Sequence, residues 1–143
     1  DYMASCSKLT GQQLMVNTLR EANDRSITLV IVSSLKDAAQ LMRQEEALFS
    51  AKIKQVVIQG GVKPFTAGGV AASDADMLVP DSAHNNEFDK DASAFFYRRC
   101  QQINTPLIVI SRFAAYSCPV PRSIYDKMAA TGSPIGEHLQ HVQ

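Results

Sequence analysis

Three short apolar runs constrain the fold of this chain more than any other feature. They are SITLVIV at residues 26–32, IKQVVIQ at residues 53–59 and PLIVIS at residues 106–111. All three are rich in β-branched residues, and the first and third are apolar almost throughout. Runs of this kind are typical of parallel strands that are buried on both faces. We therefore expect both faces of 26–32 and 106–111 to be covered.

Segments with a helical period separate these runs. In residues 9–24, Thr10 is followed three positions later by Gln13, which is the pattern of a capping box at a helix start. Further helices are predicted after Ser33-Ser34, over residues 88–104, and from Pro121 and Pro134. Strands that alternate with helices predict an α/β fold, with a mostly parallel sheet and helices on both faces.

The long connection of residues 60–85 begins where the run 53–59 ends. Ligands of open α/β sheets bind at the carboxyl ends of strands, and a connection of this length is either functional or disordered. Its start, Gly60-Gly61, is most simply a tight strand exit that needs positive φ. Its acidic residues Asp74, Asp76 and Asp81 are spaced like a cation-binding cluster, but we expect a solvated loop there.

The stretch AHNNEFDKD, residues 83–91, gathers one histidine, two asparagines and three acidic residues. Its simplest interpretation is a polar helix start, in which Asn86 is the cap and Asp89 lies three residues further on. The alternative interpretation is a ligand-binding cluster.

Composition excludes several partners. Lys+Arg and Asp+Glu are both 14, so a formal net charge of zero gives no general attraction to nucleic acid. No apolar run approaches the roughly 20 residues of a membrane span, so we expect no membrane insertion.

The cysteines are odd in number and far apart in the sequence, at Cys6, Cys100 and Cys118. This pattern disfavours a zinc site or a disulfide framework. We expect an intracellular, reducing compartment, either the cytoplasm or an organelle.

The order of several segments carries a family resemblance. SITLVIVSSLKDAAQLM, IKQVVIQGGV, the Asn/Asp stretch, TPLIVISRFAAY and PRSIYDKMAATGSPIGEHL follow one another along the chain. This series resembles the middle of the inosine–uridine-preferring nucleoside hydrolases. Residues 33–37 stand where that family has Gly-Pro-Leu-Thr-Asn, Gln59-Gly60-Gly61 where it has Met-Gly-Gly, and residues 130–134 where it has Ala-Thr-Gly-x-Pro. We expect 1–143 to be a single nucleoside-hydrolase-like domain that lacks the family's N-terminal metal-binding strand and C-terminal part.

The resemblance implies cleavage of the N-glycosidic bond of a ribonucleoside. In the family, calcium grips the ribose and polarises a water, which an aspartate deprotonates. The aspartate cluster on the first strand would lie outside this chain. We therefore expect no catalytic residue and no cofactor in this chain, and calcium only if that cluster is supplied elsewhere.

Candidate site residues follow from the resemblance. A gapless match places Asn85 at the family's ribose-binding asparagine and Ala83 at its neighbouring glutamate, and it keeps the next helix in phase. A match of Glu87-Phe88-Asp89 to Glu-Phe-Asn is the alternative. The resemblance also implies substrate contacts from Gln59, Gly60 and Gly61, and a backbone carbonyl of Val32 for the metal. We expect Val32–Ser34, Gln59–Gly61, Asn85 and Ser111–Arg112 to meet at the carboxyl edge of the sheet.

Two functions are consistent with these residues. The first is a degenerate nucleoside-hydrolase-like protein that serves as a structural or assembly subunit. The alternative is part of an active, calcium-dependent ribonucleoside N-ribohydrolase that a longer precursor or another chain completes. A small nucleoside ligand fits either function. Because exposed apolar edges promote association, we expect a protein partner or a homo-oligomer, with contact through an edge strand or the Phe95/Phe96 helix.

Overall fold

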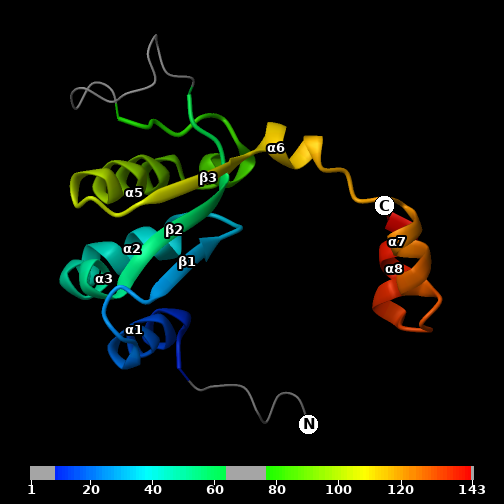
Figure 1. Ribbon diagram of the computed structural model, residues 1–143, viewed down its shortest axis with the longest axis horizontal. Coiled ribbons are helices and arrows are strands. Elements are labelled where there is room, and N and C mark those ends of the chain that lie inside the picture. The colour runs from blue at the N-terminus through cyan, green and yellow to red at the C-terminus, as the bar shows by residue number, and fades with distance from the viewer. Residues whose placement is uncertain (1–8, 64–76, 143) are drawn as a thin grey trace. The chain divides into compact units, whose positions relative to one another are not determined.

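The computed structural model describes residues 9–63 and 77–142 (Figure 1). Cys6, Asp74 and Asp76 lie outside these residues. The chain divides into two compact units, the first ending at Arg112 and the second running from Phe113 to Gln143. The prediction of one nucleoside-hydrolase-like domain stays a prediction, since a domain can contain more than one compact unit.

Helices and strands alternate through the first unit as the sequence predicts. Its elements are α1 Gly11–Glu21, β1 Ile27–Ile31, α2 Lys36–Gln44, α3 Glu46–Lys52, β2 Ile53–Gly60, α4 His84–Glu87, α5 Lys90–Gln102 and β3 Leu107–Ser111. The helices α6 Arg112–Ser117, α7 Ser123–Ala129 and α8 Pro134–Val142 follow. No helix in the described ranges combines the length and the apolar character that crossing a bilayer requires.

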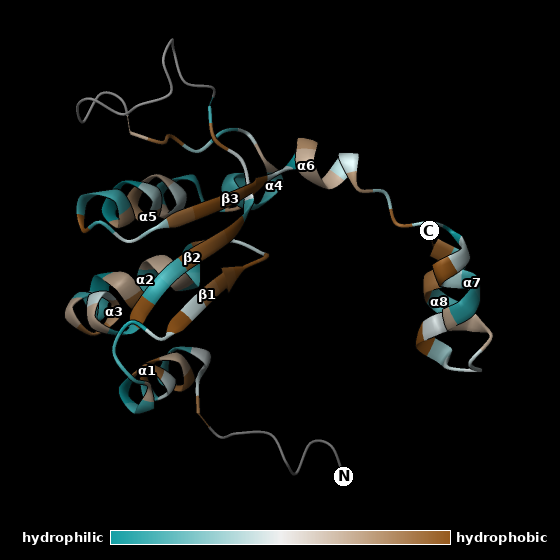
Figure 2. Cartoon of the chain, viewed as in Figure 1, coloured by the Kyte–Doolittle hydropathy of each residue, from teal (hydrophilic) through white to brown (hydrophobic). Residues whose placement is uncertain are grey.

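The three strands form one parallel sheet in the order β1-β2-β3 (Figure 1). The register places Val57 of β2 between Val30 of β1 and Ile108 of β3. The predicted fold class, an α/β fold built on a parallel sheet, is confirmed. The strands coincide with the three apolar runs of the sequence; in Figure 2, β1 and β3 are largely hydrophobic, whereas β2 also carries a hydrophilic segment.

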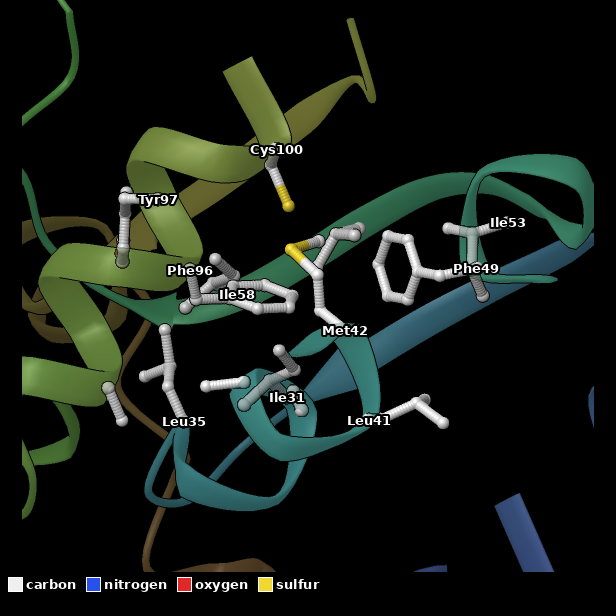
Figure 3. Packing of buried hydrophobic residues seen from close by; sticks show 14 of the residues in the cluster. Ile31, Leu35, Leu41, Met42, Phe49, Ile53, Ile58, Phe96, Tyr97 and Cys100 are labelled. Carbon is white, nitrogen blue, oxygen red and sulfur yellow. The ribbon is translucent and has the colours of Figure 1, made fainter. Parts of the chain in front are cut away.

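One face of the sheet carries the hydrophobic core. Val56 and Ile58 of β2 are fully buried there. Met42 from α2, Phe49 from α3 and Phe96 from α5 pack against this face in the same buried cluster (Figure 3). The rings of Phe49 and Phe96 meet edge to face, with centroids 6.0 Å apart and an interplanar angle of 88°.

The other face of the sheet is open within the first unit, so the expectation that β1 and β3 are buried on both faces is wrong. Val30 and Val32 are 58% and 71% exposed, and Ile108 and Ile110 are 46% and 42% exposed. Alternation explains the difference, because neighbouring side chains of a strand point to opposite faces. The core of the first unit covers only the face that Ile31, Val56 and Ile58 share.

Of the two helix caps predicted from the sequence, the one at Thr10 is confirmed and the one at Asn86 is wrong. Thr10 and Gln13 form the predicted capping box, with Gln13 N donating to Thr10 Oγ1 at 3.2 Å and Thr10 N donating to Gln13 Oε1 at 2.8 Å. Asn86 does not cap a helix, because it lies inside the short helix α4. Asp89 caps α5 instead, and its Oδ1 accepts a hydrogen bond from Ala92 N at 2.9 Å.

The second unit contains a pair of packed helices, α7 and α8. Gly132, in the turn between them, has a φ of 71°, a left-handed conformation that glycine adopts readily at the end of a helix. Gly136 of α8 is buried against the backbone of Met128, where an added Cβ would overlap the Met128 carbonyl oxygen. The Asp126 carboxylate accepts a hydrogen bond from Gln140 Nε2 at 2.8 Å.

Candidate functional site

The carboxyl end of β2 meets the short helix α4. Asn85 of α4 donates through Nδ2 to the backbone oxygen of Gln59 at 2.9 Å and to the Gln59 side-chain Oε1 at 2.6 Å. The Asn85 residue is only 9% exposed, whereas Gln59 is half-buried. The structure therefore brings together Asn85 and the end of β2, as the topology predicts. Their role as ligand contacts stays a prediction.

Asn86 makes a second, more deeply buried set of bonds to the same region. It is 2% exposed, and its Nδ2 donates to Gly61 O at 2.9 Å. The same amide lies 3.2 Å from Asp81 O and 3.3 Å from Asp81 Oδ1. Ser93 Oγ of α5 donates to the backbone oxygen of Asn86 at 3.1 Å. Asn86 thus connects the end of β2 with the segment before α4 and with α5.

Gly60 and Gly61 are required because neighbouring side chains leave no room for a Cβ, and not because of their backbone conformation. Gly132 is the glycine with positive φ in the described ranges, so the interpretation of Gly60-Gly61 as a positive-φ exit is wrong. A Cβ at Gly60 would lie 3.1 Å from the Tyr97 hydroxyl and 3.2 Å from Asn86 Oδ1. A Cβ at Gly61 would overlap the Asp81 carboxylate. Side chains of the surrounding segments therefore pack directly onto the glycine backbone.

Tyr97 of α5 lies under this turn and is fully buried. Burial raises the pKa of Tyr97 to about 12, and the nearby Asp81 carboxylate adds to the rise. The Gly61 backbone and the Asn86 side chain lie near enough to moderate it. Neither meets the geometry of a full hydrogen bond, since the Tyr97 hydroxyl and Asn86 Oδ1 both remain unbonded. Tyr97 is therefore a neutral phenol at physiological pH and a poor general base.

The remaining predicted residues lie around this centre. Ser111 pairs with Gly60 in the β2–β3 register, and β1 ends with Ile31 opposite Ile58, so Val32 follows at the same edge. Ser34 Oγ accepts a hydrogen bond from Lys36 N at 3.3 Å, at the start of α2. His84 is exposed, and its ring centroid is 5.9 Å from that of Phe88.

The described residues do not fit the calcium site that the family resemblance implies. Calcium takes six to eight oxygen ligands, usually with several carboxylates. Among residues 9–63 and 77–142, no three His, Cys, Asp or Glu side chains gather into a metal-binding group. Asp81 is the carboxylate at Gly61, and it is engaged by Ala83 N at 2.8 Å and by Asn86. No chemical step is therefore assigned to a metal here.

Solved nucleoside hydrolases share this fold. The inosine–uridine-preferring nucleoside hydrolase from Bacillus anthracis matches 87% of the chain with a TM-score of 0.60 and 18% identity. The purine-preferring ribonucleoside hydrolase from Gardnerella vaginalis matches 94% with a TM-score of 0.67 and 12% identity. The chain covers 38% of each of these two proteins. The chain therefore has a nucleoside-hydrolase-like α/β fold.

Two effector proteins are more similar in sequence to this nucleoside-hydrolase-like chain. The type III effector XopQ, solved in complex with adenosine diphosphate ribose, is 31% identical over 93% of the chain, with a TM-score of 0.81. The effector XOO4466 is 31% identical over 93%, with a TM-score of 0.79. The chain spans 36% and 35% of their lengths, about a third. No family model matches the sequence, and no curated protein matches it.

Three residues of this site are not predicted from the sequence. The sequence predicts a helix cap at Asn86 and a solvated loop at Asp81, and it indicates no role for Tyr97. The only local signal for Asn86 is its position next to Asn85, which the resemblance had already selected. Nothing in the sequence places Asp81 or Tyr97 near Gly61, because the contacts cross between distant segments.

Proposed function

We propose that the chain contributes a ribose-binding edge to a nucleoside-hydrolase-like protein and does not by itself cleave the N-glycosidic bond. The observation that carries this proposal is the Asn85–Gln59 amide pair at the carboxyl end of β2. Gln59 Oε1 accepts from Asn85, so Gln59 presents its Nε2 as a donor and Asn85 presents its Oδ1 as an acceptor. A sugar hydroxyl can accept a hydrogen bond from Gln59 Nε2 and donate one to Asn85 Oδ1. The complex of XopQ with adenosine diphosphate ribose supports a ribose-containing ligand.

The chemistry of the neighbouring groups supports binding without cleavage. Hydrolysis needs a base that takes a proton from the attacking water. The Asp81 carboxylate accepts hydrogen bonds from the Ala83 and Asn86 nitrogens, and Tyr97 is a neutral phenol. Tyr97 cannot take that proton, and Asp81 Oδ1 is already engaged by these two nitrogens.

Titration of the 143-residue chain with ADP-ribose by calorimetry tests this proposal. We expect saturable binding that Asn85→Ala weakens about tenfold, which corresponds to roughly one hydrogen bond to the ligand. The matched control, Asn17→Ala on the exposed surface of α1, should bind like the unaltered chain. Incubation with inosine or uridine should release no reducing sugar above a buffer control.

Each outcome bears on a separate part of the proposal. Absence of binding, or equal affinity for the unaltered and Asn85→Ala chains, would contradict the ribose-binding edge. Release of ribose would contradict the non-catalytic part and support the alternative, part of an active N-ribohydrolase.

A role in assembly is the second candidate, favoured by the open face of the sheet. Val30, Val32, Ile108 and Ile110 form an exposed apolar row across that face, and such patches mark interaction surfaces. The proposal rests on this sheet face and not on the two phenylalanines of the Phe95/Phe96 helix. Phe96 is fully buried, and the Arg43 guanidinium covers the Phe95 ring at 4.3 Å from its centroid.

Light scattering on the 143-residue chain tests the assembly role. At micromolar concentration we expect a mass above that of the monomer, because the chain has no net charge to oppose apolar contact. The double variant Val30→Lys/Ile108→Lys should shift the mass toward the monomer. Leu14→Lys, an exposed position of α1, is the control and should leave the mass unchanged. A monomeric unaltered chain would rule out this role.

A further inference from the structure

Two consecutive asparagines hold alternate carbonyl groups at the end of β2. Asn85 donates to Gln59 O, and Asn86 donates to Gly61 O. In an extended chain the carbonyls of residues two apart point in the same direction. The pair therefore fixes the position of α4 along β2, since a slide by one residue would break both bonds.

The two asparagines differ in their surroundings. Asn86 is more deeply buried than Asn85, and its amide is occupied by Gly61 and Asp81. Its own backbone oxygen is held by Ser93 of α5. Asn85 pairs instead with the half-buried side chain of Gln59. Asn86 is thus surrounded by protein groups, whereas Asn85 lies beside the side chain of a half-buried residue, Gln59.

We infer that Asn86 is a positioning residue that holds the Asn85–Gln59 pair in its ligand-binding geometry. This inference rests on the proposed ribose-binding edge. Asn86 ties α4 to the end of β2 and to α5, so its amide sets where the Asn85 side chain lies relative to Gln59. Loss of the Asn86 amide would free α4 to move, because Gly61 O and Asp81 Oδ1 would keep only their bonds from Asp81 N and Ala83 N, which do not involve a side chain of α4.

A double-mutant cycle separates positioning from direct contact. Asn86→Ala should weaken ADP-ribose binding about tenfold in the unaltered chain and less than about twofold in an Asn85→Ala background. The measured quantity is the dissociation constant for ADP-ribose, calculated from the concentration of folded protein in each variant. If Asn86→Ala does not fold, Ser93→Ala takes its place, because it removes a single hydrogen bond to Asn86. It should cause a smaller loss of ADP-ribose affinity, and that loss should again shrink in the Asn85→Ala background.

A second readout needs no ligand. In ¹⁵N-correlated NMR spectra, the side-chain amide signals of Asn85 should move toward those of a solvent-exposed amide in Asn86→Ala and stay in place in Asn17→Ala. Equal affinity losses in both backgrounds would show direct ligand contact by Asn86 and would overturn the inference. So would unchanged Asn85 signals or unchanged affinity. Moved signals without any ADP-ribose binding by the unaltered chain would sustain the positioning role and contradict the proposed function.

Discussion

Phe49→Ala is expected to lower the free energy of unfolding of the first unit by about 3–5 kcal/mol, the usual loss for a fully buried phenylalanine. Phe49 is completely buried in α3, and its ring meets Phe96 of α5 edge to face. Figure 3 shows it among Met42 and Ile53 at the sheet side of the core. Truncation therefore leaves a cavity between two helices and the sheet. Urea denaturation followed by circular dichroism measures the loss.

Phe88→Ala is the matched control for Phe49. Phe88 is 68% exposed, so its truncation should change the free energy of unfolding by less than about 0.5 kcal/mol. A loss below about 1 kcal/mol for Phe49→Ala would mean that the core between α3 and α5 is not closed around this ring. The comparison keeps the chemical change constant and varies only burial.

The fold was predictable from local sequence patterns because strands and helices leave periodic signals. The β-branched runs 26–32, 53–59 and 106–111 coincide with β1, β2 and β3, and Thr10 and Gln13 predicted their capping box. The burial of the strands was predicted less well. Val30 and Ile108 look like core residues in the sequence, but apolar character does not tell which face of a sheet is covered.

The site was predictable only in part, because its contacts join segments far apart in the chain. The family resemblance selected Asn85 and Gln59, and the topology of a parallel sheet placed both at its carboxyl edge. The roles of Asn86 and Gly61 depend on Asp81 and Tyr97, which no sequence period connects with them. Gly-Gly suggested a turn with positive φ, whereas close approach of side chains is the actual constraint.

Gly61→Ala is expected to lower the free energy of unfolding by about 2–3 kcal/mol, near the upper end of overpacking effects. The added Cβ would lie 2.5 Å from Asp81 Oδ1 and 2.7 Å from Asp81 Cγ. Asp81 cannot easily turn away, because Ala83 N and Asn86 Nδ2 both hold its carboxylate. The substitution would therefore push the segment before α4 off the end of β2. Denaturant unfolding measures the effect, and ADP-ribose affinity should fall with it.

Gly11→Ala is the matched control, because a Cβ at Gly11 meets nothing within 4 Å and the position lies in the first turn of α1. There the free energy of unfolding should stay constant or rise by up to about 1 kcal/mol, since alanine favours helix more than glycine. A further variant identifies the clashing group. In an Asp81→Ala background the loss caused by Gly61→Ala should shrink, because the carboxylate that the methyl group meets is gone. An equal loss in both backgrounds would show that Gly61 is required for its backbone freedom and not for the space that Asp81 occupies.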